Sequence, residues 1–497
     1  MSAGLPRPFL GLRLLLLAMV FVTACSPFGQ SQSASKPSTP AGTVKGNIVF
    51  LPTDTSTELD PAKTEVKVKP ANSNTELKTV TVKSDAGTDL AVALQNGEAG
   101  LKGELSTDSH YTVTAAATVH HQGAGDESET ETTAFSTATT PKIVATNPLS
   151  VGKGQSVVLT LSLAASDVSV DGAVDTQLAP DGLTVTLLPK TFTQGQTYNL
   201  TVVAKNKNGI AGAPQQASFN TLPPGTAAAS PDTGSTNLGV AVPLVVTLSA
   251  PPSDRNAVVS HLVVTAQGGG AAATGTANCA PYGSPAVASG TVPTTVSWLS
   301  DRKLRLVPKT PDGYWPAKST ITLKGTIQGL SSSAGNVFEG NVTTSFSSGD
   351  KRVIDVNLSN QTLTACKNGV QDNQFLISSG TASHPTYTGS FAIYRRVADE
   401  EMKSPEGPFA PDFYDIKHVP WTQYFDGSEA LHGAWWHNNF GHPMSHGCVN
   451  VQTPTDNTQW PAALPQAEWL WNFDNLGDPV VVHGVTPGLT AATQPSD

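Results

Sequence analysis

The chain has 497 residues, with 44 glycines, 37 prolines, only 14% charged residues and a formal net charge of −10. This length exceeds what one hydrophobic core supports, so we expect about three or four domains. The composition is not that of a helical bundle and favours loop-rich β structure. An acidic chain without a basic stripe is a poor candidate for binding nucleic acid, so no such partner is expected.

The first 25 residues have the pattern of a secretory signal. Arg7 and Arg13 accompany an apolar run, Leu14 to Val22, that is too short for a stable membrane-spanning helix. The run leads to Cys25, which makes the segment resemble a bacterial lipoprotein signal with cleavage before Cys25 and lipid on its thiol. This predicts a protein anchored by lipid on the outer face of the cytoplasmic membrane, in the cell envelope. A plain signal peptide with an incidental cysteine is the alternative.

Residues 26–45 are rich in Ser, Pro, Gln and Gly and nearly lack large apolar side chains, which predicts a disordered tether. Many short alternating segments separated by Gly, Pro, Asn and Asp turns follow, and this pattern is typical of β-sandwiches. A weak internal repeat divides them into three immunoglobulin-like domains at 46–141, 142–224 and 225–350. We identify no catalytic cluster in any of the three.

The pattern changes at Lys351. Segments 353–358 and 361–366 alternate as strands do, and Asn368-Gly369 predicts a tight hairpin before a strand at 375–379. These features predict a further, β-rich domain.

The rest of this domain is less regular. The aromatic and Pro-rich stretch 397–424 is interpreted as too irregular for a sheet and as a lid. Thr453-Pro454 predicts an N-cap and the first position of a short helix. Residues 480–482 predict a closing strand, and the domain is expected to end near residue 484, followed by a tail at 485–497.

Between Leu431 and Val451 the chain reads LHGAWWHNNFGHPMSHGCVNV, with four histidines and one cysteine. A cysteine attacks as its thiolate, so it needs a base such as an imidazole. A flanking glycine lets the backbone turn so that N–H groups face a developing oxyanion. The cluster therefore predicts Cys448 as nucleophile and His432 as base, with Gly447 beside the nucleophile.

Two other interpretations of the cluster were weighed. A buried structural cysteine beside hydrogen-bonded histidines would explain one Cys and one His, but not the whole set. A zinc site could draw on the same side chains, but their spacing does not match HExxH or paired CxxC, and no carboxylate lies between Leu431 and Val451. We therefore expect no metal and no cofactor.

The motif Ser445-His-Gly-Cys-Val-Asn450, with His432-Gly433 upstream, resembles the signature of the L,D-transpeptidases, which have a YkuD-type catalytic domain. The resemblance covers 351–484. The third sandwich is similar to the immunoglobulin-like domain that precedes the catalytic domain in actinobacterial members. The resemblance implies a mainly β protein, in which tandem immunoglobulin-like domains precede a β-rich catalytic domain with a short helix and a lid.

The resemblance also implies roles for individual residues. Cys448 would attack a peptidoglycan tetrapeptide stem, releasing D-Ala and leaving a thioester, and an amine of a neighbouring stem would complete a 3→3 cross-link. The other implied roles are general base (His432), carbonyl that orients the base (Gly433), oxyanion N–H groups (Gly447, Cys448), substrate positioning (His446, Ser445, Asn450) and lid tyrosine (Tyr414).

Peptidoglycan stem peptides are thus the implied partner, and carbapenems the implied inhibitors. Two alternatives stay open: an L,D-carboxypeptidase, in which water attacks the thioester, and a non-catalytic cell-wall spacer or binding lipoprotein. If Cys25 is lipidated, three cysteines remain, so at least one thiol is free. Pairing of Cys279 with Cys366 is left open, because the two lie in different predicted domains.

Overall fold

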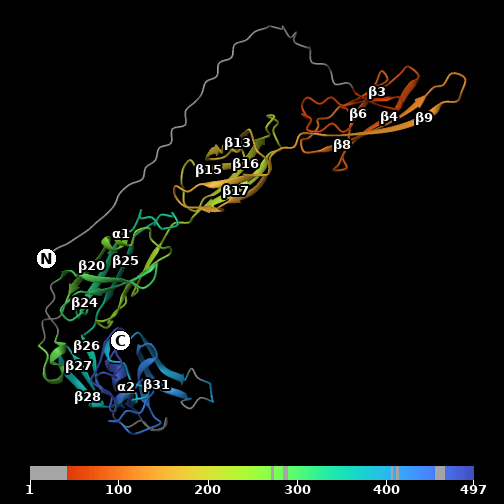
Figure 1. The fold of residues 1–497 in the computed structure, drawn as a ribbon. Helices are drawn as coiled ribbons and strands as arrows, with labels where there is room; N and C mark the ends of the chain where they lie inside the picture. The colour runs from red at the N-terminus through yellow and green to blue at the C-terminus, as the bar shows by residue number, and fades with distance from the viewer. Residues whose placement is uncertain (1–41, 270–273, 284–288, 405–406, 410–412, 454–464) are drawn as a thin grey trace, which may run out of the picture. The chain divides into compact units, whose positions relative to one another are not determined.

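The computed structural model describes residues 42–497 except 270–273, 284–288, 405–406, 410–412 and 454–464 (Figure 1). Cys25 and most of the predicted tether lie outside the described residues. The chain forms two compact units, Met1–Thr139 and Thr140–Asp497. No helix within the described ranges is long and apolar enough to cross a membrane.

The first unit is a β-sandwich built around buried Phe50, Tyr111 and Phe135, the last two with ring centroids 5.3 Å apart. The last residues of the predicted tether are not disordered. Residues 43–45 form strand β1, which pairs with Ile48–Phe50 across a turn at Gly46. The polar composition of 26–45 conceals this short strand. The strands form two sheets. The first has the order β1 (Thr43–Lys45), β2 (Ile48–Leu51), β3 (Lys67–Pro70), β7 (Glu98–Leu101), β6 (Val92–Gln95). The second has the order β5 (Asp89–Leu90), β4 (Thr75–Ser84), β8 (His110–Val119), β9 (Glu127–Ser136).

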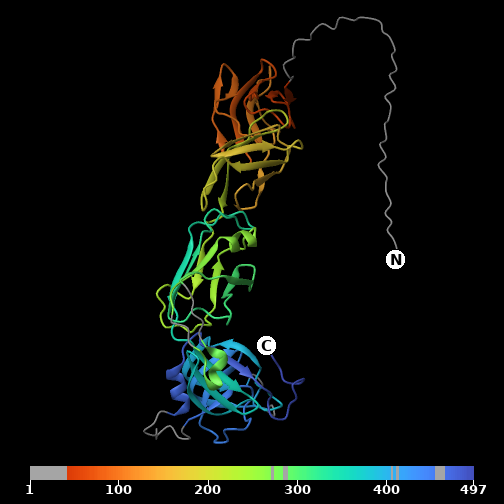
Figure 2. The same cartoon turned by 90° about the vertical axis from the view of Figure 1, so that its left-hand side faces the viewer.

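The second unit begins with another β-sandwich, formed by a continuous stretch of chain as the colours in Figure 2 show. Its strands alternate buried and exposed residues, and Tyr198 stacks on Phe219 with ring centroids 4.9 Å apart. Its two sheets are β10 (Ile143–Asn147), β12 (Val157–Leu161), β15 (Thr184–Pro189), β14 (Val174–Leu178), and β11 (Ser150–Val151), β17 (Gln215–Thr221), β16 (Thr197–Lys205), β13 (Asp167–Asp171).

A third sandwich follows, with Trp315 buried in its core and donating through Nε1 to the Val242 carbonyl at 2.7 Å. Its sheets are β18 (Ala227–Ser230), β19 (Leu244–Leu248), β23 (Lys303–Pro308), β22 (Thr294–Trp298), and β21 (Gly290–Thr291), β20 (Leu262–Gly268), β24 (Ser319–Gly325), β25 (Val342–Ser347). The loops carry α1 (Arg255–Ser260) and the 3-10 helix η1 (Ala277–Tyr282).

The C-terminal domain is a nine-stranded sheet. Asn368 and Gly369 turn the chain between β27 and β28 with φ of 52° and 83°, as the predicted hairpin requires. The described helix α2 (Gln466–Phe473) packs on the sheet through Ala467 and Leu470, whereas the helix start predicted at Pro454 lies outside the described residues. The sheet order is β29 (Gly389–Ala392), β34 (Pro479–His483), β26 (Arg352–Asn357), β27 (Thr362–Lys367), β28 (Val370–Ser378), β33 (Val449–Gln452), β32 (Glu429–Ala434), β31 (Asp415–Asp426), β30 (Arg395–Lys403).

The interpretation of 397–424 as too irregular for a sheet is wrong. Most of it forms β30 and β31, an antiparallel pair at one edge of the sheet, with a register shift between Glu400 and Met402. Pro420 is tolerated because β31 pairs with β32 only beyond it, from Gln423 onward, so its missing N–H costs no ladder bond on that side. His418 and Trp421 adopt positive φ, and these local irregularities hide the alternation in the sequence.

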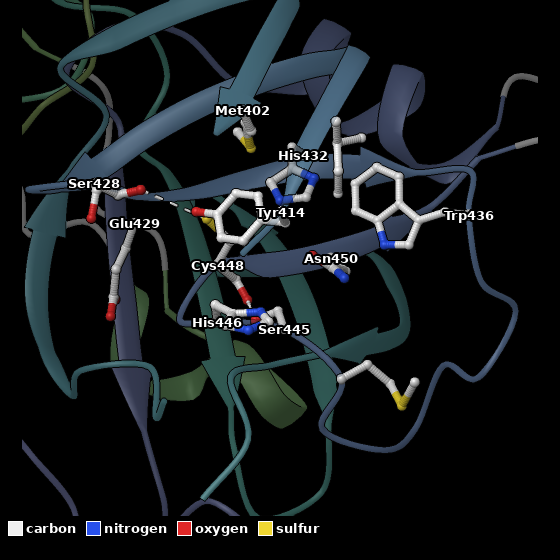
Figure 3. A pocket seen from close by; sticks show the side chains of 12 residues that line it. Met402, Tyr414, Ser428, Glu429, His432, Trp436, Ser445, His446, Cys448 and Asn450 are labelled. Carbon is white, nitrogen blue, oxygen red and sulfur yellow. Dashed lines mark hydrogen bonds between the residues drawn. The ribbon is translucent and has the colours of Figure 1, made fainter. Parts of the chain in front are cut away.

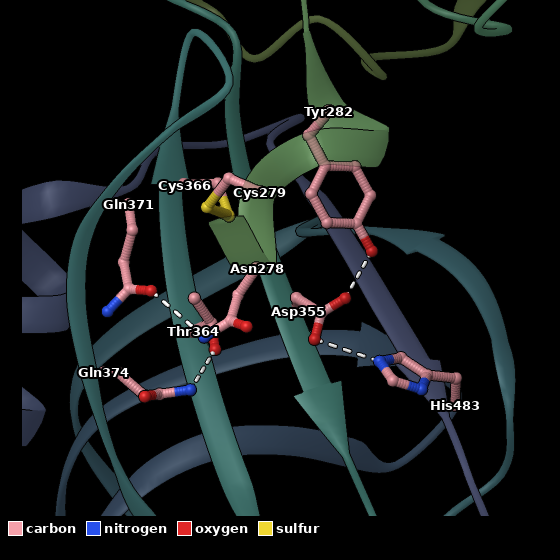
Figure 4. The surroundings of a disulfide bond; sticks show 9 residues. All are labelled: Asn278, Cys279, Tyr282, Asp355, Thr364, Cys366, Gln371, Gln374 and His483. Atoms are coloured by element: carbon pink, nitrogen blue, oxygen red, sulfur yellow. Dashed lines mark hydrogen bonds and ion pairs between the residues drawn. A yellow bond between two sulfur atoms is a disulfide. The ribbon is translucent and has the colours of Figure 1, made fainter. Parts of the chain in front are cut away.

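A disulfide joins Cys279 of η1 to Cys366 of β27, which answers the pairing that the sequence leaves open (Figure 4). Tyr282 of η1 donates a hydrogen bond to Asp355 of β26. Lys351, just before β26, lies 2.9 Å from Asp312 of the third sandwich. The third sandwich and the C-terminal sheet are therefore linked covalently and through buried polar contacts.

Replacing both Cys279 and Cys366 with Ala should lower the free energy of unfolding of the C-terminal domain by about 2–4 kcal/mol, because the bridge closes a loop of 87 residues. Urea denaturation followed by tryptophan fluorescence measures this loss as a lower midpoint. Cys448→Ala, which removes a thiol but no cross-link, is the matched control. An unchanged midpoint in the double variant would contradict the expectation.

Candidate active site

The predicted nucleophile and base lie on neighbouring parallel strands. Strand β32 pairs with β33 so that His432 is opposite Asn450, and Cys448 immediately precedes β33. Both strands are almost wholly buried over the core of the C-terminal domain. The fourteen or so residues between the strands return the chain as a loop, as parallel pairing demands. The pairing therefore brings the two side chains into one pocket.

His432 is held as a neutral base. Its ring is 3% exposed, and Nδ1 lies 3.1 Å from the carbonyl oxygen of Gly433, the arrangement that the resemblance implies. Since that carbonyl only accepts, Nδ1 carries the proton and Nε2 keeps its lone pair. Burial lowers the pKa of His432 to about 4, and the bond to Gly433 only partly offsets this. The imidazole is therefore uncharged near neutrality.

Cys448 is the one free cysteine among the described residues, and it is half-buried. Its sulfur accepts the backbone N–H of Ala430 and donates to the Ser428 carbonyl at 3.7 Å (Figure 3). Burial raises the pKa of Cys448 to about 12, and the charge of Glu429 adds to the rise. The resting pair is therefore a neutral thiol and a neutral imidazole.

Ser445 shapes the turn that carries the nucleophile. Its hydroxyl donates to the Cys448 carbonyl and accepts the Gly447 N–H at 3.2 Å. Gly447 has a φ of +124°, which a residue with a side chain rarely adopts. Because its N–H is bound to Ser445, Gly447 does not present it to an oxyanion as predicted. The backbone N–H of Cys448 remains the candidate donor for that role.

His437 orients Asn450, a role that the sequence did not indicate. The amide of Asn450 lies 2.9 Å from His437 Nε2, and His437 Nδ1 accepts the Asn439 N–H at 3.3 Å. A neutral ring that accepts at Nδ1 carries its proton on Nε2 and must donate to an oxygen. We therefore orient the amide with Oδ1 toward His437, which gives that buried oxygen its partner. The NH2 group of Asn450 then faces the pocket.

Tyr414 lies at this pocket and contacts His446, with ring centroids 5.3 Å apart. It stands just before β31, and its backbone bonds to Ser404 close the β30–β31 hairpin. His446 is exposed and also contacts His384, at 4.7 Å between ring centroids. The predicted lid tyrosine and the motif histidine thus form one wall together.

The pocket has a volume of about 180 Å³ and brings six of the predicted site residues together: Tyr414, His432, Ser445, His446, Cys448 and Asn450. Gly433 and Gly447 are not among the described residues that line it. Among the described residues no group of three or more His, Cys, Asp or Glu is placed to hold a metal ion. The lining residues that the sequence analysis missed are Met402, Ile416, Ser428, Glu429, Trp436 and Met444.

Of these six residues, Glu429 is the one with an ionisable carboxyl group. It begins β32, three positions before His432 and just outside the segment from Leu431 to Val451. Its side chain is 8% exposed, and both of its oxygens lie 3.2 Å from the Tyr387 N–H. Alternation along β32 could not have found it, because residues 429 and 431 share one face of the strand and His432 lies on the other.

A nucleophilic thiol with a neutral imidazole and backbone donors defines a cysteine-dependent acyl-transfer enzyme. Residues 351–482 match the family model of the L,D-transpeptidase catalytic domain, and residues 166–275 match a bacterial Ig domain. The second match crosses from one sandwich into the next. The C-terminal domain is thus an L,D-transpeptidase catalytic domain, and the protein is an enzyme of that family with immunoglobulin-like domains before it.

Known relatives are similar to about half of the chain. L,D-transpeptidase 1 of Mycobacterium tuberculosis is 26% identical over 272 residues, which are 52% of this chain and 86% of the relative. Probable L,D-transpeptidase 3 of the same organism is 25% identical over 271 residues, 49% of this chain and 82% of the relative. The solved L,D-transpeptidase from Mycobacterium smegmatis is 23% identical with a TM-score of 0.38, covering 52% of this chain and 99% of its own.

The protonation state of Cys448 predicts a pH dependence that alkylation can measure. With a pKa of about 12, the thiolate fraction should rise steadily with pH, so the rate of iodoacetamide labelling should climb without a plateau from about pH 5 to 10. Mass analysis of the peptide containing Cys448 follows the reaction, and Cys448→Ala supplies the blank. A constant, fast rate from about pH 5 to 8 would instead reveal a thiolate–imidazolium pair.

Proposed function

We propose that the enzyme forms 3→3 cross-links in peptidoglycan through a thioester on Cys448. The observation that carries the proposal is the pairing of β32 with β33, which places a free cysteine and a buried neutral base in one pocket of an L,D-transpeptidase catalytic domain. Near neutrality a neutral pair suits general-base catalysis, because the proton leaves sulfur only as sulfur attacks.

In the first half-reaction the Cys448 sulfur attacks the carbonyl carbon of the third residue of a tetrapeptide stem. The thiol proton passes to Nε2 of His432, and the backbone N–H of Cys448 donates to the developing oxyanion. The bond to the terminal D-Ala then breaks, and the leaving amine takes the proton from His432. Asn450 and His446 hold the stem, and Tyr414 covers it from the β30–β31 hairpin.

In the second half-reaction the side-chain amine of a neighbouring stem attacks the thioester carbonyl. The carbon–sulfur bond breaks, an amide forms and the thiol is regenerated. Water in place of the amine would give an L,D-carboxypeptidase, and product analysis separates the two outcomes.

Acylation by a carbapenem tests the nucleophile. The solved LD transpeptidase LdtMt1 was studied in complex with imipenem, and a Mycobacterium tuberculosis L,D-transpeptidase 3 with a faropenem-derived adduct. Here imipenem should add one adduct to Cys448, because its strained ring carbonyl is attacked as a stem carbonyl would be. Cys448→Ala should show none, and His432→Gln should react about 10²-fold more slowly. A wild-type protein without an adduct would refute the proposal.

We propose further that the enzyme is a lipoprotein of the cell envelope, anchored through Cys25. The support is the apolar run ending in Cys25 and the polar stretch after it, which would hold the catalytic domain away from the membrane. Mass analysis of the protein purified from membranes should find diacylglycerol-modified Cys25 as the first residue. Cys25→Ser should shift the protein to the soluble fraction; unchanged membrane retention would contradict the anchor.

A further inference from the structure

Glu429 is the only carboxylate among the twelve described residues that line the pocket, and none of the twelve is Lys or Arg. No salt bridge to Glu429 forms within the described part of the chain. Among the described residues only the Tyr387 N–H donates a hydrogen bond to it. A buried carboxyl group with so few donors is unusual for a purely structural residue.

The groups that face Glu429 are acidic or neutral. Tyr387 donates from the segment before β29, Gly447 and Cys448 lie in the motif turn, and Asp426 lies three residues earlier on β31. Burial, with a smaller contribution from Asp426, raises the pKa of Glu429 to about 8, which the Tyr387 N–H lowers only in part. Asp426 itself feels the charge of Asp497. The carboxyl group therefore exchanges its proton near physiological pH.

Glu429 also lies on a distinct side of the nucleophile. In Figure 3, Ser428 and Glu429 stand on one side of Cys448, and Trp436 and Asn450 stand on the other. A two-substrate acyl transfer needs two approaches to one sulfur, one for each substrate. The side with Asn450 supplies amide donors for a peptide, whereas the side with Glu429 supplies a carboxyl group that ionises as the pH approaches about 8.

We propose that Glu429 binds the ammonium group of the second substrate and accepts its proton, so that the amine can attack the thioester. This role deepens the proposed cross-linking function and rests on it. An amine acceptor arrives protonated near neutrality, and an ammonium ion has no lone pair with which to attack. His432 does not take this proton, because it relays the second nitrogen proton to the departing sulfur.

The step balances without any other reactant. The ammonium gives one proton to the Glu429 carboxylate, and the free amine attacks the thioester carbonyl carbon. The carbon–sulfur bond then breaks, and the second nitrogen proton passes through His432 to the departing sulfur. The products are the amide, the Cys448 thiol and a protonated Glu429, which returns its proton to solvent.

Glu429→Gln in the full-length protein tests the proposal, because glutamine keeps an oxygen for the Tyr387 N–H but cannot take a proton. With a disaccharide-tetrapeptide whose third residue bears a free side-chain amine, formation of cross-linked dimer should fall about 10²-fold or more. Acylation by imipenem, which needs no amine, should change by less than about threefold. The wild-type dimer rate should rise with pH as Glu429 ionises, and this rise should be absent from the variant.

Hydroxylamine provides a decisive comparison, because it is a neutral nucleophile at pH 7 and needs no proton acceptor. Release of the acyl group from the thioester as hydroxamate should be equally fast in wild type and Glu429→Gln. Asp426→Asn, which removes a neighbouring charge outside the pocket, is the matched control and should retain dimer formation. Equal losses of imipenem acylation, hydroxylamine release and dimer formation would show that Glu429 only supports the fold and would overturn the proposal. Failure of the wild type to acylate would instead refute the proposed function.

Discussion

The parallel pairing of β32 with β33 is the constraint on which the site depends. Register places His432 beside Asn450 and therefore close to Cys448, which comes just before β33. The hydrophobic core stabilises this pairing, because Leu431, Val449 and Val451 pack in the same buried cluster as residues of α2. It also leaves no room for a side chain at Gly433, where a Cβ would lie 2.8 Å from Pro420 and 3.3 Å from Ala467. The segment whose carbonyl orients the imidazole is thus closely packed.

The same burial sets the charge state of the pair. Desolvation disfavours both a thiolate and an imidazolium, so it raises the pKa of Cys448 and lowers that of His432. An ion pair would lower this cost only if its hydrogen bonds were good, and here the thiol is bound to Ser428 and Ala430 instead. The thiol of Cys448 therefore stays protonated until a substrate carbonyl lies against the sulfur. The backbone N–H groups then stabilise the negative charge that develops on the carbonyl oxygen.

Sequence predicted the features that are local in the chain. The motif around Cys448, the strands at 353–358 and 361–366 and the turn at Asn368-Gly369 follow from alternation and turn chemistry. Features that depend on distant partners were not predictable. Strands β30 and β31 were not predicted, because a register shift and residues with positive φ interrupt the alternation of buried and exposed side chains. The Cys279–Cys366 bridge and the contact of Glu429 with Tyr387 join segments 87 and 42 residues apart, so neither leaves a periodic signal.

The charges in the pocket are matched to the order of the two half-reactions. The first half-reaction needs a base that is free of its proton, and burial provides this in His432 whatever the state of Glu429. A carboxylate there hinders a resting thiolate, since its charge raises the pKa of Cys448. Once sulfur is acylated that penalty disappears, because a thioester carries no charge. The same carboxylate can then favour a cationic amine over water. Placing an acidic side chain beside a nucleophile that works from its neutral form therefore costs little in acylation and favours transfer to an amine over hydrolysis.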